Sequence, residues 1–291
     1  MATPQFIKDK VQTIIQLPTL PAIAEEVVEM VDNPKTSASK LGKVIESDQG
    51  LTSKVLKIAN SAFYGFPKQI STVDFAIIVL GFDALKEIVI SISLVSALQK
   101  KGDESFDARG FWDHSIYSGV IARRLARDLG YRVSGEVFVG GLLHDMGMSV
   151  LHQHFNAEYR QIAARADGSG MSFFDAEMET LGVTHAEIGG WLAERWNFPS
   201  HLVEAISKHH KPLAADENPD LVSIIHCADV LANMLSDAPM VFDRGLEFDQ
   251  DVLRRLNLDD PVLLDEYIAR YRSILASDMK QFEAMFGSTR H

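Results

Sequence analysis

The segment Gly140-Gly-Leu-Leu-His-Asp-Met-Gly147 sets two adjacent titratable side chains, His144 and Asp145, into an apolar frame typical of the end of a buried helix. Burying such side chains is costly unless another group compensates them. A divalent metal is the simplest compensation, because a carboxylate and a neutral imidazole are both good ligands. The segment therefore predicts a buried helix end that carries part of a metal site.

On both sides of this segment, apolar residues recur with the period of a helix rather than that of a strand. Local start signals agree with this period. The tetrad Thr184-His-Ala-Glu187 has the form of a capping box, and Pro199 and Asn218-Pro219 are typical helix openings. A further helix is predicted from about residue 111 to 129. We find no strong strand or hairpin signal, so the predicted fold is all-α.

The segment Lys101-Gly-Asp-Glu-Ser-Phe-Asp107 is short and polar and has no helical period. It is the best candidate for a boundary between two parts of the chain. We predict an N-terminal helical bundle over residues 1–105 and a larger helical bundle over residues 106–291. A chain of 291 residues is long enough for two such units.

The formal net charge of −12 disfavours loose binding to nucleic acid or to an anionic membrane. Cys227 is the single cysteine, which excludes an intrachain disulfide and a thiolate zinc cluster and fits a reducing cytoplasm. The longest uncharged apolar stretch, residues 88–98, is too short to span a bilayer. The N-terminal residues have no apolar signal core. We therefore expect a cytoplasmic protein with no membrane partner and no nucleic-acid partner.

Seven side chains of metal-ligand type lie on separate predicted helices or at their ends: His114, His144, Asp145, His185, His209, His210 and Asp229. Each histidine has an ordinary alternative, since it can face solvent or be stabilised by the dipole of a helix C-terminus. Asp229 differs, because it lies in the apolar run Ser223-Ile-Ile-His-Cys-Ala-Asp-Val-Leu231. A buried carboxylate needs a cation, a metal or several donors. Together these residues predict that the seven side chains point into one interior cavity of a helix bundle.

The order His114, His144-Asp145, Asp229 resembles the core of the HD phosphohydrolase superfamily. The wider chain is similar to the HDOD family, the HD-related output domains of bacterial signalling proteins. In the N-terminal half the resemblance rests on Leu17-Pro-Thr-Leu-Pro21, on Ile45-Glu-Ser-Asp-Gln-Gly-Leu-Thr-Ser-Lys-Val-Leu-Lys-Ile-Ala-Asn-Ser-Ala-Phe-Tyr-Gly65 and on Ile70-Ser-Thr-Val-Asp-Phe-Ala-Ile-Ile-Val-Leu-Gly81. It covers nearly all of the chain and implies an N-terminal helical subdomain followed by an HD-domain-like metal-binding bundle.

The resemblance extends to a second set of ligands. His185 and His209-His210 resemble the second-metal ligands of HD-GYP phosphodiesterases, which cleave cyclic dinucleotides. Such an enzyme carries lysine where this chain has Met148, and its Gly-Tyr-Pro segment is missing after His210. Methionine cannot replace the charge with which lysine contacts a phosphate. The resemblance therefore implies metal binding more strongly than cleavage of a cyclic dinucleotide.

Two metals would share Asp145, because a carboxylate has two oxygens and an imidazole offers one nitrogen at a time. Of the remaining ligands, His114, His144 and Asp229 would hold the first metal, and His185 and His209 would hold the second. His210 would join the second metal if the helix ends between His209 and His210. We expect one or two divalent transition metals, with iron first, or manganese, cobalt, nickel or zinc. Nitrogen and carboxylate ligands without thiolate suit these metals better than calcium or magnesium.

Two functions of different classes follow. The first is a bacterial regulatory protein whose metal site is structural or regulatory and whose N-terminal bundle contacts an unidentified signalling protein. The second is an active metal-dependent phosphohydrolase or phosphodiesterase on a nucleotide or cyclic dinucleotide, in which two metals activate water and clamp a phosphate. A sealed site favours the regulator, whereas an open site beside a basic residue favours the enzyme.

Two smaller patterns bear on ligands and partners. The helix predicted to carry His114 also carries three arginines, Arg123, Arg124 and Arg127. They could bring positive charge to a phosphate-containing ligand, or form a solvated helix face. A predicted loop carries three aromatic residues, Phe63, Tyr64 and Phe66. These could form a contact patch for a partner, or pack the loop onto its own domain.

Overall fold

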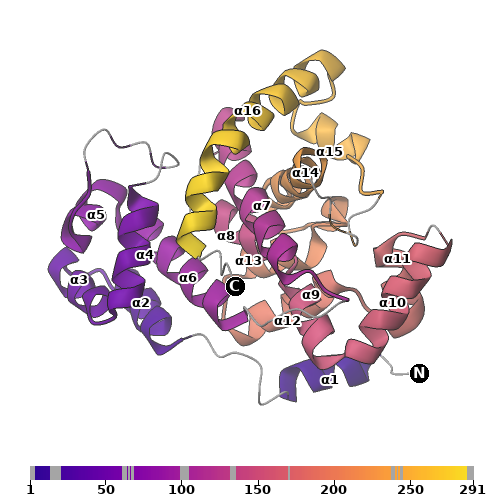
Figure 1. The fold of residues 1–291 in the computed structure, drawn as a ribbon, viewed down its shortest axis with the longest axis horizontal. Helices are drawn as coiled ribbons and strands as arrows, with labels where there is room; N and C mark the ends of the chain where they lie inside the picture. Colours follow the sequence, from indigo (N-terminus) through magenta and orange to yellow (C-terminus); the bar gives the residue numbers. More distant parts are fainter. Residues whose placement is uncertain are drawn as a thin grey trace.

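The computed structural model describes residues 4–13, 21–60, 64, 66, 69–98, 105–131, 136–169, 171–236, 240, 242 and 245–286. Within these residues all regular structure is helical and no strand is present, which confirms the predicted all-α fold. Figure 1 shows one group of helices, α2 to α5, at one end of the molecule and the longer helices α7 and α14 near its centre. In the described part of the chain, every helix is too short or too polar to cross a membrane.

The first helices along the chain are α1 (Pro4–Thr13), α2 (Ala22–Asp32), α3 (Ala38–Glu46), α4 (Gln49–Ala59), α5 (Val73–Leu80) and α6 (Phe82–Leu98). The side chains of Ser37, Asp48 and Thr72 each accept a backbone N–H in the first turn of α3, α4 and α5. Such a cap satisfies a donor that the start of a helix otherwise leaves unpaired. Helices α2 to α6 pack against one another and bury their apolar faces in a shared core.

The later helices are α7 (Ala108–Asp128), α8 (Glu136–Leu143), α9 (Met146–His154), α10 (Asn156–Ser169), α11 (Phe173–Leu181), α12 (His185–Arg195), α13 (Ser200–Lys208), η1 (Pro212–Ala214, a 3-10 turn), α14 (Pro219–Leu235), α15 (Gln250–Arg255) and α16 (Pro261–Phe286). Helices α7, α8 and α14 pack together, and α12 packs against α9 and α13. These contacts bring the ends of α8 and α13 and the start of α12 to one place.

The start of α7 differs from the prediction, because the helix begins at Ala108 rather than near residue 111. Asp107 supplies the reason, since its carboxylate accepts the backbone N–H groups of Arg109 and Gly110. The capping box at Thr184 and the openings at Pro199 and Asn218 are confirmed. Residues 101–104 of the predicted boundary, residues 14–20 and Phe63 lie outside the described residues. The division into 1–105 and 106–291 therefore stays a prediction.

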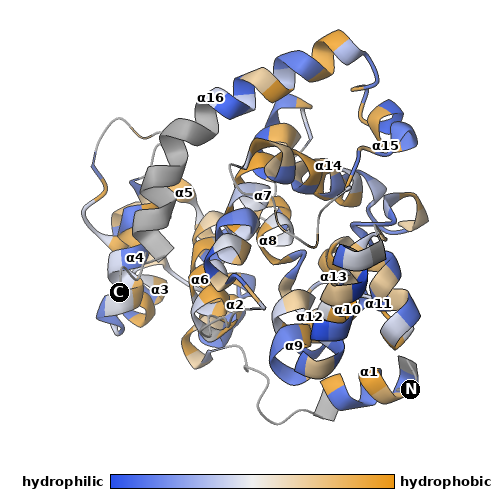
Figure 2. Ribbon diagram, turned by 45° about the vertical axis from the view of Figure 1, so that its right-hand side comes forward, coloured by the Kyte–Doolittle hydropathy of each residue, from blue (hydrophilic) through white to orange (hydrophobic). Residues whose placement is uncertain are grey.

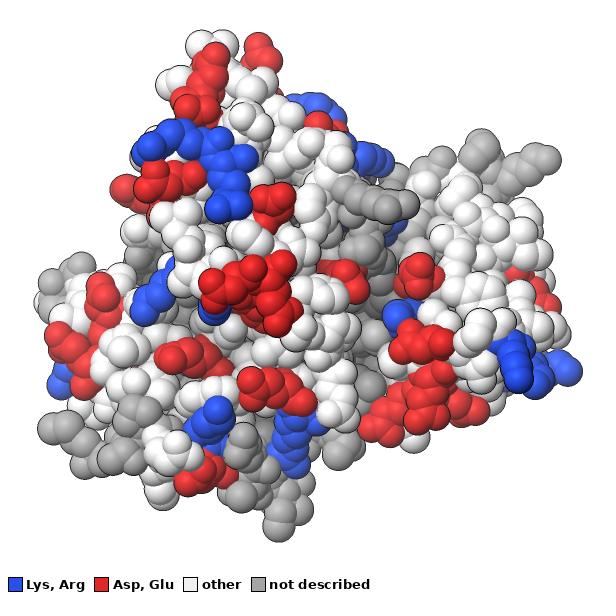
Figure 3. All heavy atoms as spheres, turned by 180° about the vertical axis from the view of Figure 1, so that it is seen from behind, with Lys and Arg blue, Asp and Glu red and all other residues white. Residues whose placement is uncertain are grey.

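Contacts between distant parts of the chain tie the fold together. Helix α1 packs against α12, far along the sequence, and α6 packs against α8. Helix α16 contacts α4, α7 and α14. Hydrophobic residues, orange in Figure 2, gather on α6, α8 and α14, and many of them belong to the buried core. Acidic side chains form several clusters on the face in Figure 3, as the net charge of −12 predicts.

Two glycines of the segment 140–147 allow close helix contacts, Gly141 between α8 and α7 and Gly147 between α9 and α12. A Cβ atom at Gly141 would lie 2.8 Å from both the Gly119 Cα and the Ser118 carbonyl oxygen of α7. A Cβ atom at Gly147 would overlap the carbonyl oxygen of His185 at the start of α12. Only a residue without a side chain fits such contacts. The turn between α8 and α9 is thus held between α7 and α12.

Candidate metal centre

The structure brings all seven predicted ligand side chains together. They come from five places in the fold: His114 on α7, His144 and Asp145 in the turn between α8 and α9, His185 at the start of α12, His209 and His210 in the turn after α13, and Asp229 on α14. Six of them are between 0% and 3% exposed, and His210 is partly buried. They fall into two groups of four that share Asp145, with the ligand atoms of each group within 4.8 Å of one another.

The first group joins α7, α14 and the turn after α8. The Nε2 atom of His114 lies 3.1 Å from Oδ1 of Asp229. The Nε2 atom of His144 lies 3.1 Å from Oδ2 of Asp145 and 3.4 Å from Oδ1 of Asp229. All four side chains are buried. The two carboxylates and two imidazoles therefore face one small volume in the core.

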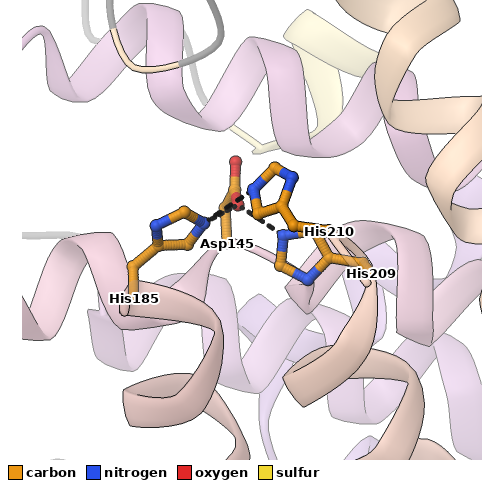
Figure 4. A group of neighbouring side chains, drawn as sticks. All are labelled: Asp145, His185, His209 and His210. Atoms are coloured by element: carbon orange, nitrogen blue, oxygen red, sulfur yellow. Dashed lines mark hydrogen bonds and ion pairs between the residues drawn. The ribbon is translucent and has the colours of Figure 1, made fainter. Parts of the chain in front are cut away.

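The second group comprises Asp145, His185, His209 and His210, whose side chains point toward one another (Figure 4). Oδ1 of Asp145 is 3.2 Å from Nε2 of His185 and 3.4 Å from Nε2 of His209. The Nε2 atom of His210 is 3.1 Å from that of His185. Helix α13 ends at Lys208, so both His209 and His210 lie in a turn and both can face inward. Asp145 thus directs one oxygen to each group.

Hydrogen bonds on the far side of the imidazoles fix their orientation. The Nδ1 atoms of His144 and His209 lie 2.7 Å from the carbonyl oxygens of Gly141 and Ile206, the residues three positions earlier. A carbonyl can only accept, so each Nδ1 carries a proton and donates it. In the neutral ring this leaves the Nε2 lone pair pointing into the centre, as a metal ligand requires.

Glu177, which was not predicted from the sequence, contacts the candidate ligand His185. Its carboxylate on α11 is fully buried and lies 2.8 Å from Nδ1 of His185, and it also accepts the backbone N–H of His185 at 3.0 Å. A carboxylate behind a histidine orients the ring and raises the basicity of its other nitrogen. The available signal was position, because Glu177 shares the buried face of α11 with Phe173 and Leu181.

His226 supports the turn that carries the second group. Its Nδ1 atom lies 2.9 Å from the carbonyl oxygen of His209, and its Nε2 atom accepts the backbone N–H of Asp249 at 3.3 Å. One nitrogen therefore donates and the other accepts, as in a neutral imidazole. Burial lowers the pKa of His226 and keeps it in that form. His226 is a positioning residue rather than a candidate ligand.

A family model of the HDOD domain matches residues 17–212 of the chain. The chain belongs to the HDOD family. The resemblance read from its motifs is thereby confirmed. Six of the seven candidate ligands of this HDOD chain lie inside the matched region, and Asp229 lies beyond it.

Solved structures resemble the HDOD chain over nearly its whole length. An HDOD domain protein of unknown function from Geobacter sulfurreducens is 26% identical, with a TM-score of 0.69 over 90% of this chain and 93% of that one. A candidate phosphohydrolase from Shewanella amazonensis is 26% identical, with a TM-score of 0.73 over 96% and 97%. An uncharacterised protein of Treponema pallidum is 27% identical over 253 residues, which are 81% of this chain. The chain spans about half (48%) of the length of that curated relative.

The electrostatics of the HDOD centre separate its ligands. Burial would raise the pKa of Asp145 and Asp229, but nearby imidazoles, His144 above all, hold both well below the usual range of a carboxyl. Burial would lower the pKa of His144 and His185, but the carboxylates beside them raise it well above the usual range. Burial and neighbouring imidazoles lower the pKa of the last two histidines, His209 and His210. The centre therefore contains ionised carboxylates and at least two neutral imidazoles.

The donor set fits a divalent cation. Both oxygens of Asp145 and of Asp229 are buried, and no described backbone amide or hydroxyl donates to them. What faces Oδ2 of Asp145 is the Nε2 atom of His144, whose proton is on Nδ1 when the ring is neutral. Two acceptors at that distance repel unless a proton or a cation lies between them. Carboxylate and imidazole atoms converging in this way are the ligands that a transition metal takes in proteins.

Other residues raised by the sequence lie elsewhere. Burial raises the pKa of Cys227 to about 12, which makes it a core residue rather than a nucleophile. Met148 is fully buried and cannot contact a solvent-borne phosphate. Arg123, Arg124 and Arg127 of α7 line a separate cavity with Tyr64 and Phe66. The sequence left two uses open for these arginines, charge for a phosphate-containing ligand or a solvated helix face, and both stay predictions.

Proposed function

We propose that this HDOD chain is a regulatory signalling protein whose buried metal centre holds its helices in one arrangement. The observation that carries the proposal is burial: six of the seven ligand side chains are at most 3% exposed. A metal in that position crosslinks α7, α12, α14 and the turns after α8 and α13. Ligand convergence from separate helices makes metal binding part of the folding free energy.

The proposed ligands are the two groups that share Asp145. The first metal takes His114, His144, Asp145 and Asp229, and the second takes Asp145, His185, His209 and His210. We propose iron first, or manganese, cobalt, nickel or zinc, because imidazole and carboxylate suit these ions. The chain's own part is to orient the ligands, through Gly141, Ile206 and Glu177, and to exclude water from them.

We further propose that the centre acts on the partner surface of the protein through packing. Helix α7 carries His114, and α16, which packs against α7, also reaches α4 in the N-terminal group of helices. A change in the metal could therefore alter how the proposed units 1–105 and 106–291 sit together. The partner expected on this basis is a signalling protein that contacts the N-terminal helices.

Phosphohydrolase activity is the second candidate function. It is favoured by the convergence of two ligand groups on one carboxylate, the arrangement with which two metals clamp a phosphate. The similarity to a candidate phosphohydrolase from Shewanella amazonensis points the same way. Against it stand the burial of the ligands and Met148 at the position where related phosphodiesterases carry lysine. His210, the one partly buried ligand, marks where a substrate would have to enter.

Metal analysis and a hydrolysis screen test the two functions together. Purified wild-type protein is expected to hold a transition metal, and Asp145→Asn, which keeps the side-chain shape but removes the bridging charge, is expected to lose it. Asp259→Asn, at an exposed carboxylate, is the matched control and should keep the metal. The screen covers phosphomonoesters, nucleotides and cyclic dinucleotides.

The outcomes separate the candidates. Bound metal without turnover supports the regulatory centre. Turnover that disappears in Asp145→Asn but persists in Asp259→Asn establishes the phosphohydrolase in its place. Undiminished metal content in Asp145→Asn removes the centre altogether, provided that thermal unfolding shows the variant to be folded.

A further inference from the structure

A cavity of about 280 Å³ lies where the segment after α4, the helices α5 and α6, and α7 meet. Its described lining combines three arginines with two aromatic rings and apolar side chains of α5 and α6; the arginines and aromatic residues are Arg123, Arg124, Arg127, Tyr64 and Phe66. None of them is a candidate metal ligand.

The arginines are well separated from the metal centre. Arg123 follows His114 by nine residues on α7, which is about 13 Å along the helix axis. The three residues share one side of α7, because Arg127 follows Arg124 by three positions and Arg123 by four. A ligand of this cavity is therefore distinct from one bound at Asp145.

The charge of the lining selects an anion. A guanidinium has five N–H donors, so an arginine that already contacts a neighbour keeps donors for a ligand. Its planar fork matches two oxygens of a phosphate. Asp128, which follows these arginines on α7, points its carboxylate at α16, where it accepts from Arg270 and Tyr271 at 2.9 Å each. In a chain of net charge −12, a cavity with three guanidinium groups attracts anions locally.

The aromatic residues add a surface for a planar group. The guanidinium carbon of Arg123 lies 4.7 Å from the centre of the Tyr64 ring, so cation and ring are stacked. Phe66 is 39% exposed at the same cavity. Rings and guanidinium planes arranged in this way are what nucleic-acid bases stack on. The volume lies just below the range of typical ligand pockets, about 300 to 1,000 Å³, which limits the ligand to the size of a single nucleotide.

We propose that this cavity, which we call the arginine pocket, binds a nucleotide, with the phosphate on the arginines and the base against Tyr64 and Phe66. The pocket joins α5 and α6 to the helix that carries His114. A ligand bound there therefore contacts both the N-terminal helices and a helix of the metal centre, and such a ligand can act as an effector by changing how these helices pack. The proposal is independent of the metal and of any hydrolysis.

Calorimetric titration of the full chain with AMP and with GMP tests the proposal. Inorganic phosphate and adenosine are the comparison probes, since the first has only the phosphate group and the second only the nucleoside. We expect at least one nucleotide to bind more tightly than either half. The double variant Arg124→Gln/Arg127→Gln should weaken that binding at least tenfold. The matched control Arg254→Gln/Arg255→Gln removes the same charge from α15 and should leave it unchanged.

Three further variants make the result specific. Tyr64→Leu should weaken the nucleotide but not inorganic phosphate, and Arg127→Lys, which keeps the charge without the fork, should have an intermediate effect. Asp145→Asn should retain nucleotide binding, because the arginine pocket shares no residue with the metal centre. The unfolding midpoint of each variant without ligand separates loss of the pocket from loss of the fold.

Several results would overturn the proposal. These are absence of binding by both nucleotides, equal affinity in the Arg124→Gln/Arg127→Gln variant, and phosphate binding as tight as nucleotide binding with no effect of Tyr64→Leu. Loss of binding in Asp145→Asn would place the nucleotide at the metal centre instead. Failure of the metal centre alone, with nucleotide binding intact, leaves the arginine pocket standing.

Discussion

The two ligand groups share Asp145 but differ in charge and exposure. The first has two carboxylates and two imidazoles, all buried. The second has three imidazoles and only the shared carboxylate, and it includes His210, the one ligand that is partly buried. Because the two groups share the single charge of Asp145, the first group adds one further carboxylate charge, that of Asp229, and the second adds none. We therefore expect the first group to hold its metal more tightly and the second to exchange it.

Their outer supports differ in a compensating way. His144 and His209 donate to backbone carbonyl oxygens, which carry only partial charge. His185 of the second group is backed by the Glu177 carboxylate, at 2.8 Å from its Nδ1 atom. The second group has less negative charge among its ligands, and the Glu177 carboxylate behind His185 partly supplies it.

The largest expected effect comes from Gly147, which lets α9 approach the start of α12. In Gly147→Ala the new methyl group overlaps the carbonyl oxygen of His185 and lies 2.8 Å from the backbone nitrogen of Gly189. Backbone atoms cannot rotate away, so we expect the free energy of unfolding to fall by about 3 kcal/mol and the second group to lose its metal first. Denaturant unfolding and metal analysis measure the two effects.

Gly168→Ala is the control for this change, since Gly168 is an exposed helical residue with nothing within 4 Å of an added Cβ atom. It should be neutral or stabilising by about 0.5–1 kcal/mol. Equal stability of the two variants would show that α9 and α12 are not in close contact.

A pair of ligand variants compares the groups directly. Asp229→Asn removes a carboxylate that only the first group uses, and His210→Ala removes an imidazole that only the second group uses. We expect His210→Ala to keep one metal ion and lose the other, and Asp229→Asn to lose the tighter ion. Elemental analysis after dialysis against a weak chelator reads the stoichiometry. If both variants lose the same ion, the groups are not independent.

Glu177→Gln tests the support behind His185. The amide keeps one oxygen, which can still accept from both Nδ1 and the backbone N–H of His185 as Oε2 does in the wild type, but it loses the negative charge and the second acceptor for Nδ1. Changes of this kind typically weaken metal binding about 10- to 100-fold. We expect that loss only for the more labile ion, measured by competition with a chelator. Equal weakening of both ions would contradict the assignment of Glu177 to the second group.

The smallest effect is expected for Glu204→Gln, which changes the stability of the fold outside the metal centre. Burial would raise the pKa of Glu204, but the backbone N–H groups of residues 216–218 and Lys208 lower it to about 2. A lowered pKa stabilises the folded protein above the unfolded value of about 4.5, and this contribution fades as the pH falls toward 2. We expect a loss of about 1–2 kcal/mol at neutral pH, with metal content unchanged.

The pH dependence provides the check on that assignment. The difference in unfolding free energy between wild type and Glu204→Gln should be full at pH 7 and should shrink as the pH falls below about 4.5. A difference that is constant from neutral to acid pH would mean that the carboxylate of Glu204 is not what ties the start of α14 to α13.

Helix starts were predictable because their causes are local. The caps at Thr184 and Asn218 use residues within three positions of the backbone groups that they satisfy. The start of α7 was placed too late, since the cap at Asp107 lay inside a segment that looked like a boundary. Composition and period cannot distinguish a polar connector from the cap at its end.

The contact of Glu177 with His185 could not be predicted from neighbouring residues. Nothing within a few residues of it marks a functional site, and its meaning comes from His185, which lies eight positions later on another helix. The same holds for the arginine pocket. Tyr64 and Arg123 stack at 4.7 Å although they are far apart in the sequence. Contacts of this kind follow from how helices pack, which depends on the whole core.

The amino-acid sequence alone determined that the chain is helical, that it resembles the HDOD family and which seven side chains have the chemistry of metal ligands, because periodicity, caps and ligand type are properties of residues and their near neighbours. Only the tertiary structure decided that Asp145 faces both ligand groups, that Glu177 stands behind His185 and that three arginines line a cavity of their own. The physical reason is that such distances are set by close packing of helices at points like Gly141 and Gly147, where one methyl group would be too many.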